Sequence, residues 1–129
     1  MRELRIIIAG SRDFTDANLL EEKCEKIIEE EMKKDPERIV KIISGGARGA
    51  DMLGENFARK KGYELKRFPA KWMTYGKLAG SIRNREMLIY ACQTEALLIA
   101  FWDGLSRGTR NMIEIAKNGN VPTEVVYAM

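Results

Sequence analysis

The sequence predicts a single α/β domain over residues 1–129, in which helices cover both faces of a mostly parallel sheet of about five strands and so form three layers. Short apolar runs alternate along the chain with longer segments whose apolar residues recur at helical spacing. Glycine-containing turns directly follow several of these runs, as at the strand-to-helix turns of parallel sheets. With 129 residues, of which 45% are hydrophobic, the chain is long enough to bury its own core.

Five apolar runs are expected to form the strands. They cover residues 4–9, 39–43, 63–68, 96–102 and 123–127. The first run is rich in isoleucine and ends at Gly10, which is typical of a strand buried on both faces. The third run alternates least clearly between apolar and polar residues. Because helical segments separate the runs, we expect the strands to be parallel.

Four segments have the pattern of helices. They are expected from Asp16 to about Lys34, over about 50–61, from Ser81 to about Cys92 and over about 110–117. Asp16 and Ser81 are suitable N-caps, and Gly62 suits the position after the last turn of the second helix. Asp35-Pro36 ends the first helix. Residues 69–80 show no periodicity, so a loop is expected there.

The composition excludes several kinds of catalytic site. The chain has no histidine, which rules out a Ser-His-Asp triad, a Cys-His pair and a histidine zinc site. Cys24 and Cys92 lie in helical segments without Cys-x-x-Cys spacing, which predicts reduced, buried thiols and no metal. The net charge of +3 is too small to indicate a nucleic-acid surface by itself. The apolar run before Gly10 is too short for a signal peptide or a membrane span, so we expect a cytoplasmic protein.

The segment Ser44–Asp51, with the sequence Ser-Gly-Gly-Ala-Arg-Gly-Ala-Asp, joins an apolar run to a helical segment. Such a turn predicts a phosphate cradle, because glycine permits close approach of a ligand and the first helical N–H groups are unpaired. Arg48 adds a guanidinium suited to phosphate, and Asp51 in the first helical turn suits the helix dipole or a ribose hydroxyl. The alternative is a tight turn that binds nothing.

The segment differs from both common nucleotide loops. A P-loop continues with Lys and Ser or Thr, but Gly49 is followed by Ala50 and Asp51. Only the Gly46-x-x-Gly49 half of a dinucleotide fingerprint is present, and the next strand ends in Arg67-Phe68-Pro69 without a ribose-binding carboxylate. A dehydrogenase is therefore disfavoured.

Charged residues gather in the segments that follow strands. They are Arg12, Arg48, Arg83, Arg85, Arg107 and Arg110 with Asp13, Asp51 and Asp103. These segments share one edge of a parallel sheet, where ligands bind at the reversal of strand order, and arginine there suits bidentate phosphate recognition. Each of Arg107 and Arg110, taken alone, is more simply interpreted as a member of a surface ion pair. Arg83 and Arg85 are about 200° apart around a helix, so only one can face a given pocket.

Four segments together resemble a known family. They are Gly-Ser-Arg-Asp-Phe at 10–14, Ser-Gly-Gly-Ala-Arg-Gly-Ala-Asp at 44–51, Gly-Ser-Ile-Arg-Asn-Arg-Glu-Met at 80–87 and Phe-Trp-Asp-Gly-Leu-Ser-Arg-Gly-Thr at 101–109. This pattern resembles the YspA-like, cpYpsA-related branch of the SLOG superfamily, which includes the Lonely Guy phosphoribohydrolases and the DNA-processing A proteins. The resemblance implies a Rossmann-like fold and a nucleotide-derived ligand. Its phosphate would bind at Ser44-Gly45-Gly46 and Gly108-Thr109, beside Gly10, Ser11 and Arg12.

The candidate ligand-binding residues follow from these patterns and from the resemblance. They are Gly10, Ser11, Arg12, Asp13, Ser44, Gly45, Gly46, Ala47, Arg48, Asp51, Trp72, Arg83, Asn84, Arg85, Asp103, Ser106, Gly108 and Thr109. Trp72 is the first candidate for stacking on a base, with Phe14, Tyr75 and Trp102 as alternatives. No cofactor is certain, and an ADP-ribose or NAD-derived ligand is compatible with the pattern.

The resemblance does not carry the Lonely Guy activity to this chain. Those enzymes have Pro-Gly-Gly-x-Gly-Thr-x-x-Glu, and here Met112 takes the place of the glutamate. A thioether can neither stabilise an oxocarbenium ion nor position water. Asp13, Asp51 or Asp103 could supply a carboxylate instead, and the sequence does not choose among them.

The leading hypothesis is a sensor or carrier of a nucleotide-derived ligand, with N-glycosidic or phosphoribosyl hydrolysis left open. The alternative is binding of single-stranded DNA, for which Lys71, Trp72, Tyr75 and Lys77 offer a short basic, aromatic stretch. The glutamate-rich segment 21–31 argues against a broad cationic surface. A third reading is an oligomerising domain with a vestigial pocket. We expect a homodimer or a higher homo-oligomer, and no membrane association.

Overall fold

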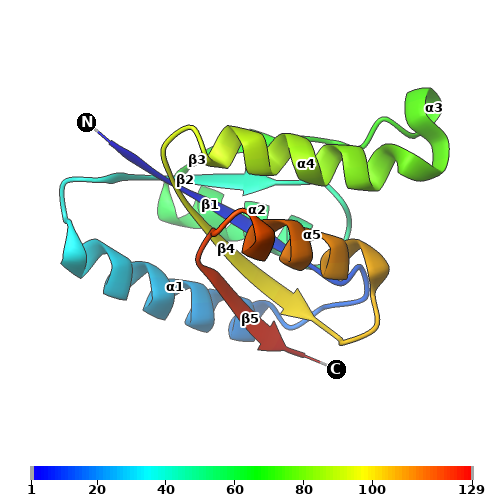
Figure 1. Ribbon diagram of the computed structural model, residues 1–129. Coiled ribbons are helices and arrows are strands. Elements are labelled where there is room, and N and C mark those ends of the chain that lie inside the picture. Colours follow the sequence, from blue (N-terminus) through cyan, green and yellow to red (C-terminus); the bar gives the residue numbers. More distant parts are fainter. Residues whose placement is uncertain (1, 129) are drawn as a thin grey trace.

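Strand β1 (Glu3–Gly10) is the middle strand of a five-stranded sheet in this computed structural model, which describes residues 2–128 (Figure 1). The strand order is β3-β2-β1-β4-β5 and every neighbouring pair is parallel. The other strands are β2 (Ile39–Ser44), β3 (Glu64–Arg67), β4 (Glu95–Trp102) and β5 (Thr123–Tyr127). The expected α/β fold with three layers is confirmed, and the sheet is entirely parallel.

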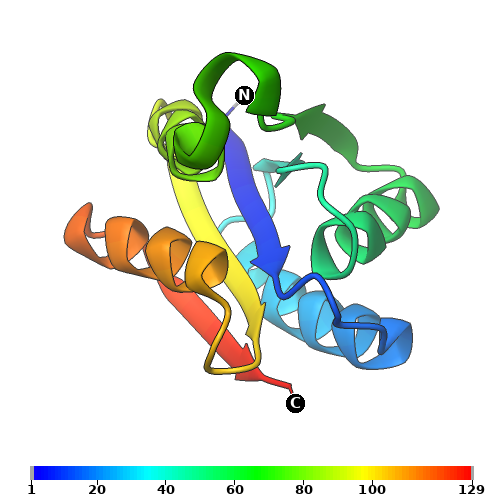
Figure 2. The same ribbon diagram turned by 90° about the vertical axis from the view of Figure 1, so that its right-hand side faces the viewer.

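Helices cover both faces of the sheet (Figure 2). Helices α1 (Ala17–Lys34) and α2 (Ala50–Lys61) pack on one face, and α4 (Ala79–Ala91) and α5 (Arg107–Asn118) pack on the other. Successive residues of a strand point to opposite faces. Ile6 and Ile8 accordingly lie in the core beneath α1 and α2, whereas Ile7 lies in the core beneath α4 and α5.

The ends of the first two helices agree with the sequence prediction. The Asp16 carboxylate accepts a hydrogen bond from the Leu19 amide at 3.0 Å, which is an N-cap contact. Gly62 follows α2 in the left-handed conformation, with φ of 75°, and its amide donates to the carbonyls of Ala58 and Arg59. Such a cap satisfies carbonyl groups that the helix leaves free.

The prediction of a loop over residues 69–80 is wrong in part. A one-turn helix, α3 (Trp72–Tyr75), and a 3-10 turn, η1 (Gly76–Leu78), lie there and lead directly into α4. The Ser81 hydroxyl donates to the Leu78 carbonyl at 3.1 Å, so Ser81 is inside the helix and not its N-cap. A helix of four residues is too short to produce a periodic apolar pattern, and α3 extends away from the sheet (Figure 1).

Two further expectations need correction. Helix α5 begins at Arg107, three residues earlier than expected, because Gly108 in its first turn weakens the helical signal. Cys24 is buried as expected, but Cys92 is exposed at the end of α4. Within residues 2–128, no helix combines the length and apolarity that a membrane span requires.

Candidate functional site

A cavity of about 570 Å³ opens at the carboxyl edge of the sheet. Its walls come from the segment after β1, the segment after β4 with the start of α5, the start of α2, and α3 to α4. The chain places β2 on one side of β1 and β4 on the other, so this is the point where strand order reverses. Ligands of open parallel sheets bind in such crevices.

Most candidate residues line this cavity, and five do not. Those in its wall are Gly10, Ser11, Arg12, Asp13, Ala47, Arg48, Asp51, Trp72, Arg83, Asn84, Ser106, Gly108 and Thr109. Those outside it are Ser44, Gly45, Gly46, Arg85 and Asp103. The wall also contains residues that were not candidates, namely Ala9, Lys77, Gly80, Ser81, Met87, Arg107, Asn111 and Met112.

The first turn of α5 offers the cavity free backbone donors. The amides of Arg107, Gly108 and Thr109 donate to no group within residues 2–128, and all three residues line the cavity. The N-cap Ser106 makes no side-chain capping bond. Unpaired N–H groups at a helix N-terminus carry partial positive charge and bind anions. This turn therefore presents three unpaired donors to the cavity.

Asp103 shapes the turn before α5 and does not face the cavity. Its carboxylate accepts hydrogen bonds from the amides of Leu105, at 2.8 Å, and Ser106, at 2.7 Å. It also accepts the Ser106 hydroxyl at 2.8 Å. These bonds, with the Ser106 amide first, lower the pKa of Asp103 to about 2. The oxygen atoms of Asp103 thus hold the loop, and its expected contact with a ligand stays a prediction.

The glycine turn after β2 is held by the protein itself. The buried Ser44 hydroxyl donates to Glu55 at 2.7 Å and accepts the Gly46 amide at 3.0 Å. Glu55 is also buried and accepts a hydrogen bond from Arg67 at 3.0 Å. These contacts occupy the Ser44 hydroxyl and the Gly46 amide. Ser44, Gly45 and Gly46 lie outside the cavity wall, and binding of a phosphate by this turn stays a prediction.

Gly49 brings the start of α2 against the segment that follows β1. Its φ is 78°, and a Cβ atom there would lie 2.4 Å from the carbonyl oxygens of Ser11 and Arg12. The Ala50 amide donates to the Ser11 carbonyl at 3.2 Å. Only glycine combines this backbone conformation with such a close approach. The two segments consequently form one continuous wall.

Arg83 faces the cavity and Arg85 does not, in agreement with the helical geometry expected for the pair. The Arg83 guanidinium donates to the Gly45 carbonyl through Nη1 and to Asn84 Oδ1 through Nε at 3.1 Å. Burial lowers the pKa of Arg83, which the nearby Asp51 charge opposes. Arg85 lies exposed on the same helix. Arg83 is thus a fixed, partly desolvated cation at the site.

Asn84 connects α4 to the first turn of α5. Its buried side chain donates to the Gly108 carbonyl at 3.1 Å and to Asn111 Oδ1 at 3.0 Å. Because its oxygen accepts Arg83 Nε, the same amide orients the cation and the helix turn. Asn84 accordingly acts in positioning as well as lining the wall.

Asp51 is a buried carboxyl group in the cavity wall, with 6% of its surface exposed. It accepts a hydrogen bond from the Ala47 amide at 3.2 Å. Burial raises the pKa of Asp51 to about 6, although the Ala47 bond and the charge of Arg83 act in the opposite direction. A strongly perturbed carboxyl group in a cleft is typical of functional sites.

Trp72 forms part of the rim. Its indole is half exposed, and the Arg12 guanidinium lies 5.6 Å from the ring centroid. The alternative stacking candidates lie elsewhere. Phe14 packs on Phe101 in the core, while Trp102 donates to the Ser106 carbonyl at 3.0 Å. Tyr75 is exposed outside the cavity wall.

Comparison with known proteins identifies the family. The model of the YspA, cpYpsA-related SLOG family matches residues 4–75, more than half of the chain. The chain belongs to this family. It is also 33% identical over 125 residues to the Gene 61 protein of Mycobacterium phage D29, and the match covers 92% of each chain. No solved structure matches.

The matched SLOG region extends from β1 to α3 and includes all of α2, whereas α4 and α5 lie beyond it. Within the cavity, Met112 takes the position that the Lonely Guy resemblance gives to a glutamate, and it is almost fully buried. Met87 lies beside it in the wall and in the same core cluster. The floor of the cavity in this SLOG protein is therefore apolar where those enzymes carry a carboxylate.

Two residues at the site differ from what the sequence indicates. Taken alone, Arg107 is predicted to form a surface ion pair, but it lines the cavity and makes no ion pair within residues 2–128. Glu55 is not among the candidates, although it lies four residues after Asp51 and therefore on the same face of the helix. That spacing is the signal that could have indicated its role in holding Ser44.

Proposed function

We propose that this cavity binds a nucleotide or nucleotide-derived ligand through its phosphate, and that the protein is a sensor or carrier of that ligand. The observation that carries the proposal is the set of free amides at Arg107, Gly108 and Thr109, which face a cavity that also contains the guanidinium groups of Arg12 and Arg83. Backbone donors and arginine together match the charge and geometry of phosphate.

The size and rim of the cavity support a ligand larger than phosphate alone. A volume of about 570 Å³ lies within the range of small-molecule sites, roughly 300–1,000 Å³. Trp72 offers an aromatic face at the rim, next to Arg12. In this proposal the phosphate lies on the first turn of α5 and the base stacks on Trp72.

The cavity offers little for chemistry on the ligand. The carboxylates in its wall are Asp13, which is strongly exposed, and Asp51. Met112 supplies no acid or base at the position of the Lonely Guy glutamate. Binding is thus the primary proposal, and every ligand found is to be tested for N-glycosidic or phosphoribosyl hydrolysis by chromatography of the products.

A thermal-shift screen tests the proposal. The probes are mononucleotides, nucleoside diphosphate sugars, ADP-ribose and nicotinamide dinucleotides. A ligand at one hundred times its Kd adds about 2.7 kcal/mol to the free energy of unfolding, which gives a clear shift. Arg83→Met should reduce the shift strongly, because it takes away the cavity cation that Gly45 and Asn84 hold in place. Arg85→Met is the matched control and should retain it.

The screen also distinguishes the alternative. If no nucleotide shifts the protein, while a single-stranded oligonucleotide binds with an affinity that falls steeply with salt, the DNA-binding function replaces the proposed one. The basic and aromatic residues Lys71, Trp72, Tyr75 and Lys77 would then be the surface to mutate. Gly46→Val is a poor test variant, because Gly46 has φ of 71° and its Cβ would lie 2.9 Å from Arg67.

Self-association is the second part of the proposal. Met73 is fully exposed, and Leu78 and Tyr75 are exposed next to it on α3 and η1. Exposed apolar groups gathered on one projecting segment are typical of interaction surfaces. We expect a homodimer by sedimentation equilibrium, and Met73→Glu should convert it to a monomer. A wild-type chain that sediments as a monomer at all concentrations would contradict this part.

A further inference from the structure

We propose that the ligand carries a ribose with free hydroxyl groups and that Asp51 accepts hydrogen bonds from them, so that the site selects ribonucleotides over deoxyribonucleotides. The inference rests on the proposed function, since it concerns the same cavity. The phosphate contacts do not distinguish a ribose from a deoxyribose, whereas a contact with Asp51 does.

The position of Asp51 provides the first step. The residue is 6% exposed, yet it belongs to the cavity wall. Its Oδ2 atom accepts the Ala47 amide at 3.2 Å, whereas Oδ1 accepts no hydrogen bond from residues 2–128. Within that part of the chain, no fully buried side-chain oxygen or nitrogen lacks a partner. Oδ1 is therefore open to the cavity.

The charge of Asp51 is not neutralised by a neighbouring cation. A Cβ atom on Gly45 would lie 2.9 Å from Asp51 Oδ2 and 2.5 Å from Arg83 Nη1, so the two groups flank the same point. They nevertheless form no ion pair within 4.0 Å, because the Arg83 Nη1 group donates to the Gly45 carbonyl. Burial of the residue disfavours its charged form and raises the pKa of Asp51. A ligand group that donates a hydrogen bond to Oδ1 favours the charged form again.

The chemistry of a carboxylate selects the kind of ligand group. An ionised carboxylate only accepts hydrogen bonds and repels phosphate. The hydroxyl groups of a ribose are neutral donors, and a vicinal diol can donate to one carboxylate. Asp13, the other acid in the wall, is strongly exposed and already lies 3.6 Å from Arg48. Asp51 is consequently the acid suited to accept hydrogen bonds from the ribose hydroxyl groups.

The sugar and phosphate positions belong to one cavity. Asp51 lies in the first turn of α2, which follows β2, and the free amides lie in the first turn of α5, which follows β4. Strands β2 and β4 flank β1 on its two sides, and all four residues line the same cavity. One ribose 5′-phosphate can therefore contact both helix starts across the end of β1. Gly10 and Ser11, at the end of β1, lie beneath it in the wall.

Calorimetric titration with matched sugars tests the inference. The probes are AMP, GMP, CMP and UMP, each compared with its 2′-deoxy and 3′-deoxy counterparts. For the base that binds best, we expect the ribonucleotide to bind at least tenfold more tightly than one of the deoxy forms. Asp51→Asn should reduce this ratio to less than twofold, because a neutral amide is a weaker acceptor. Glu86→Gln removes an exposed charge outside the cavity and should leave the ratio unchanged.

The outcomes separate this inference from the function on which it depends. Equal binding of ribonucleotides and deoxyribonucleotides by the wild type, with binding lost in Arg83→Met, overturns the ribose inference and leaves the phosphate site standing. Absence of binding by every nucleotide overturns both. Discrimination that persists in Asp51→Asn assigns the sugar contact to another residue and contradicts the role of Asp51.

Discussion

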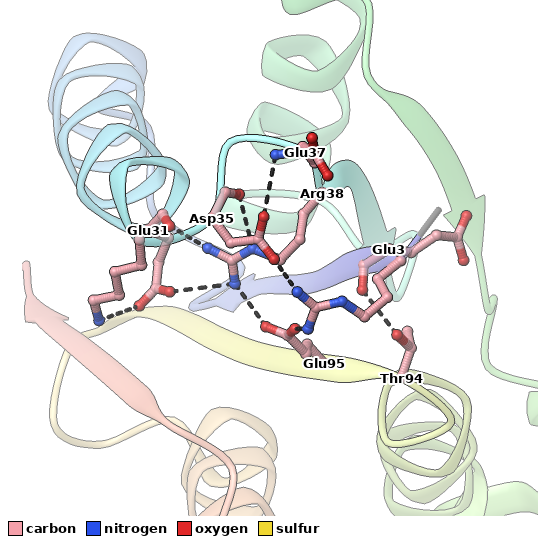
Figure 3. A network of polar contacts seen from close by, with 9 residues as sticks. Glu3, Glu31, Asp35, Glu37, Arg38, Thr94 and Glu95 are labelled. Carbon is pink, nitrogen blue, oxygen red and sulfur yellow. Dashed lines mark hydrogen bonds and ion pairs between the residues drawn. The ribbon is translucent and has the colours of Figure 1, made fainter.

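The two edges of the sheet both combine arginines with carboxylates, but they use them in opposite ways. At the amino edge, the Arg38 side chain is 4% exposed and every nitrogen of its guanidinium has an acceptor within the chain (Figure 3). Nε donates to the Asp35 carbonyl, Nη1 to Glu95 and Nη2 to the Glu31 carbonyl. Arg2 adds contacts to Asp35 and Glu95. This edge is complete without a ligand.

At the carboxyl edge, the arginines and the buried acid are not fully paired within the chain. Arg12, Arg83 and Arg107 make no ion pair within residues 2–128, and Asp51 keeps one oxygen free. A smaller cavity of about 270 Å³ at the amino edge is lined by Glu31, Arg38 and Glu95, but its donors and acceptors already bind one another. Pairing within the chain, more than the presence of charge, thus distinguishes the amino edge from the edge at which we propose binding.

The largest effect is expected from Arg38→Met, which breaks the amino-edge network. Removing this buried cation leaves Glu31 and Glu95 without their partner and should lower the free energy of unfolding by about 3 kcal/mol. Urea denaturation measures the change. Nucleotide affinity of the folded variant should equal that of the wild type. A variant that unfolds like the wild type, or that loses ligand binding, would contradict the division between the two edges.

Asp51→Asn should stabilise the protein at neutral pH. The folded-state pKa of about 6 lies above the value of 3.8 for an unfolded aspartate, so the folded state binds more protons between these values. The free energy of unfolding therefore falls as pH rises from about 4 to 6, and the substitution should restore about 2 kcal/mol at pH 7.5. Most of this gain should disappear at pH 4.

Urea denaturation at both pH values checks this prediction, and Asp13→Asn, at an exposed position, is the control with no expected change. A destabilised Asp51→Asn variant at pH 7.5 would show that Asp51 is satisfied in the fold. If Asp51→Asn is instead more stable and also loses its preference for ribonucleotides, then Asp51 lowers the stability of the fold in favour of ligand binding.

Trp72→Ala should weaken ligands that carry a base and spare those that do not. A base stacked on an aromatic ring contributes roughly 1–3 kcal/mol, so affinity for a mononucleotide should fall about tenfold or more. Inorganic phosphate should bind the variant as it binds the wild type. Because the indole is half exposed, stability should change little. Calorimetry measures both affinities. An equal loss of affinity for phosphate and for the mononucleotide would contradict stacking of the base on Trp72.

The sequence predicts the fold well because its strands are buried and strongly apolar. The isoleucine-rich β1 and the Asp16 and Gly62 caps are local signals that the structure confirms. The edge with the cavity was also predictable, since strand-to-helix segments of a parallel sheet must meet there. Arg83 could be separated from Arg85 by helical geometry, but only the fold shows which of them faces inward.

The remaining details depend on contacts between residues distant in the sequence. Glu55 accepts the Ser44 hydroxyl because α2 folds back along β2, and for this reason we propose the phosphate position at α5 and not at the glycine turn. The Asp103 carboxylate accepts hydrogen bonds from the amides of its own loop, because the turn closes around it. The four residues of α3 were missed because one helical turn has no period to detect.

The most direct test of a binding carboxyl edge is a titration followed by ¹⁵N–¹H correlation spectra. The probe is the mononucleotide that gives the largest thermal shift, compared with inorganic phosphate. We expect the amide signals of Arg107, Gly108 and Thr109 to move most with both probes, while those of Glu31, Arg38 and Glu95 stay in place. Changes centred on Ser44–Gly46, on residues 71–78 alone or on the amino edge would contradict it.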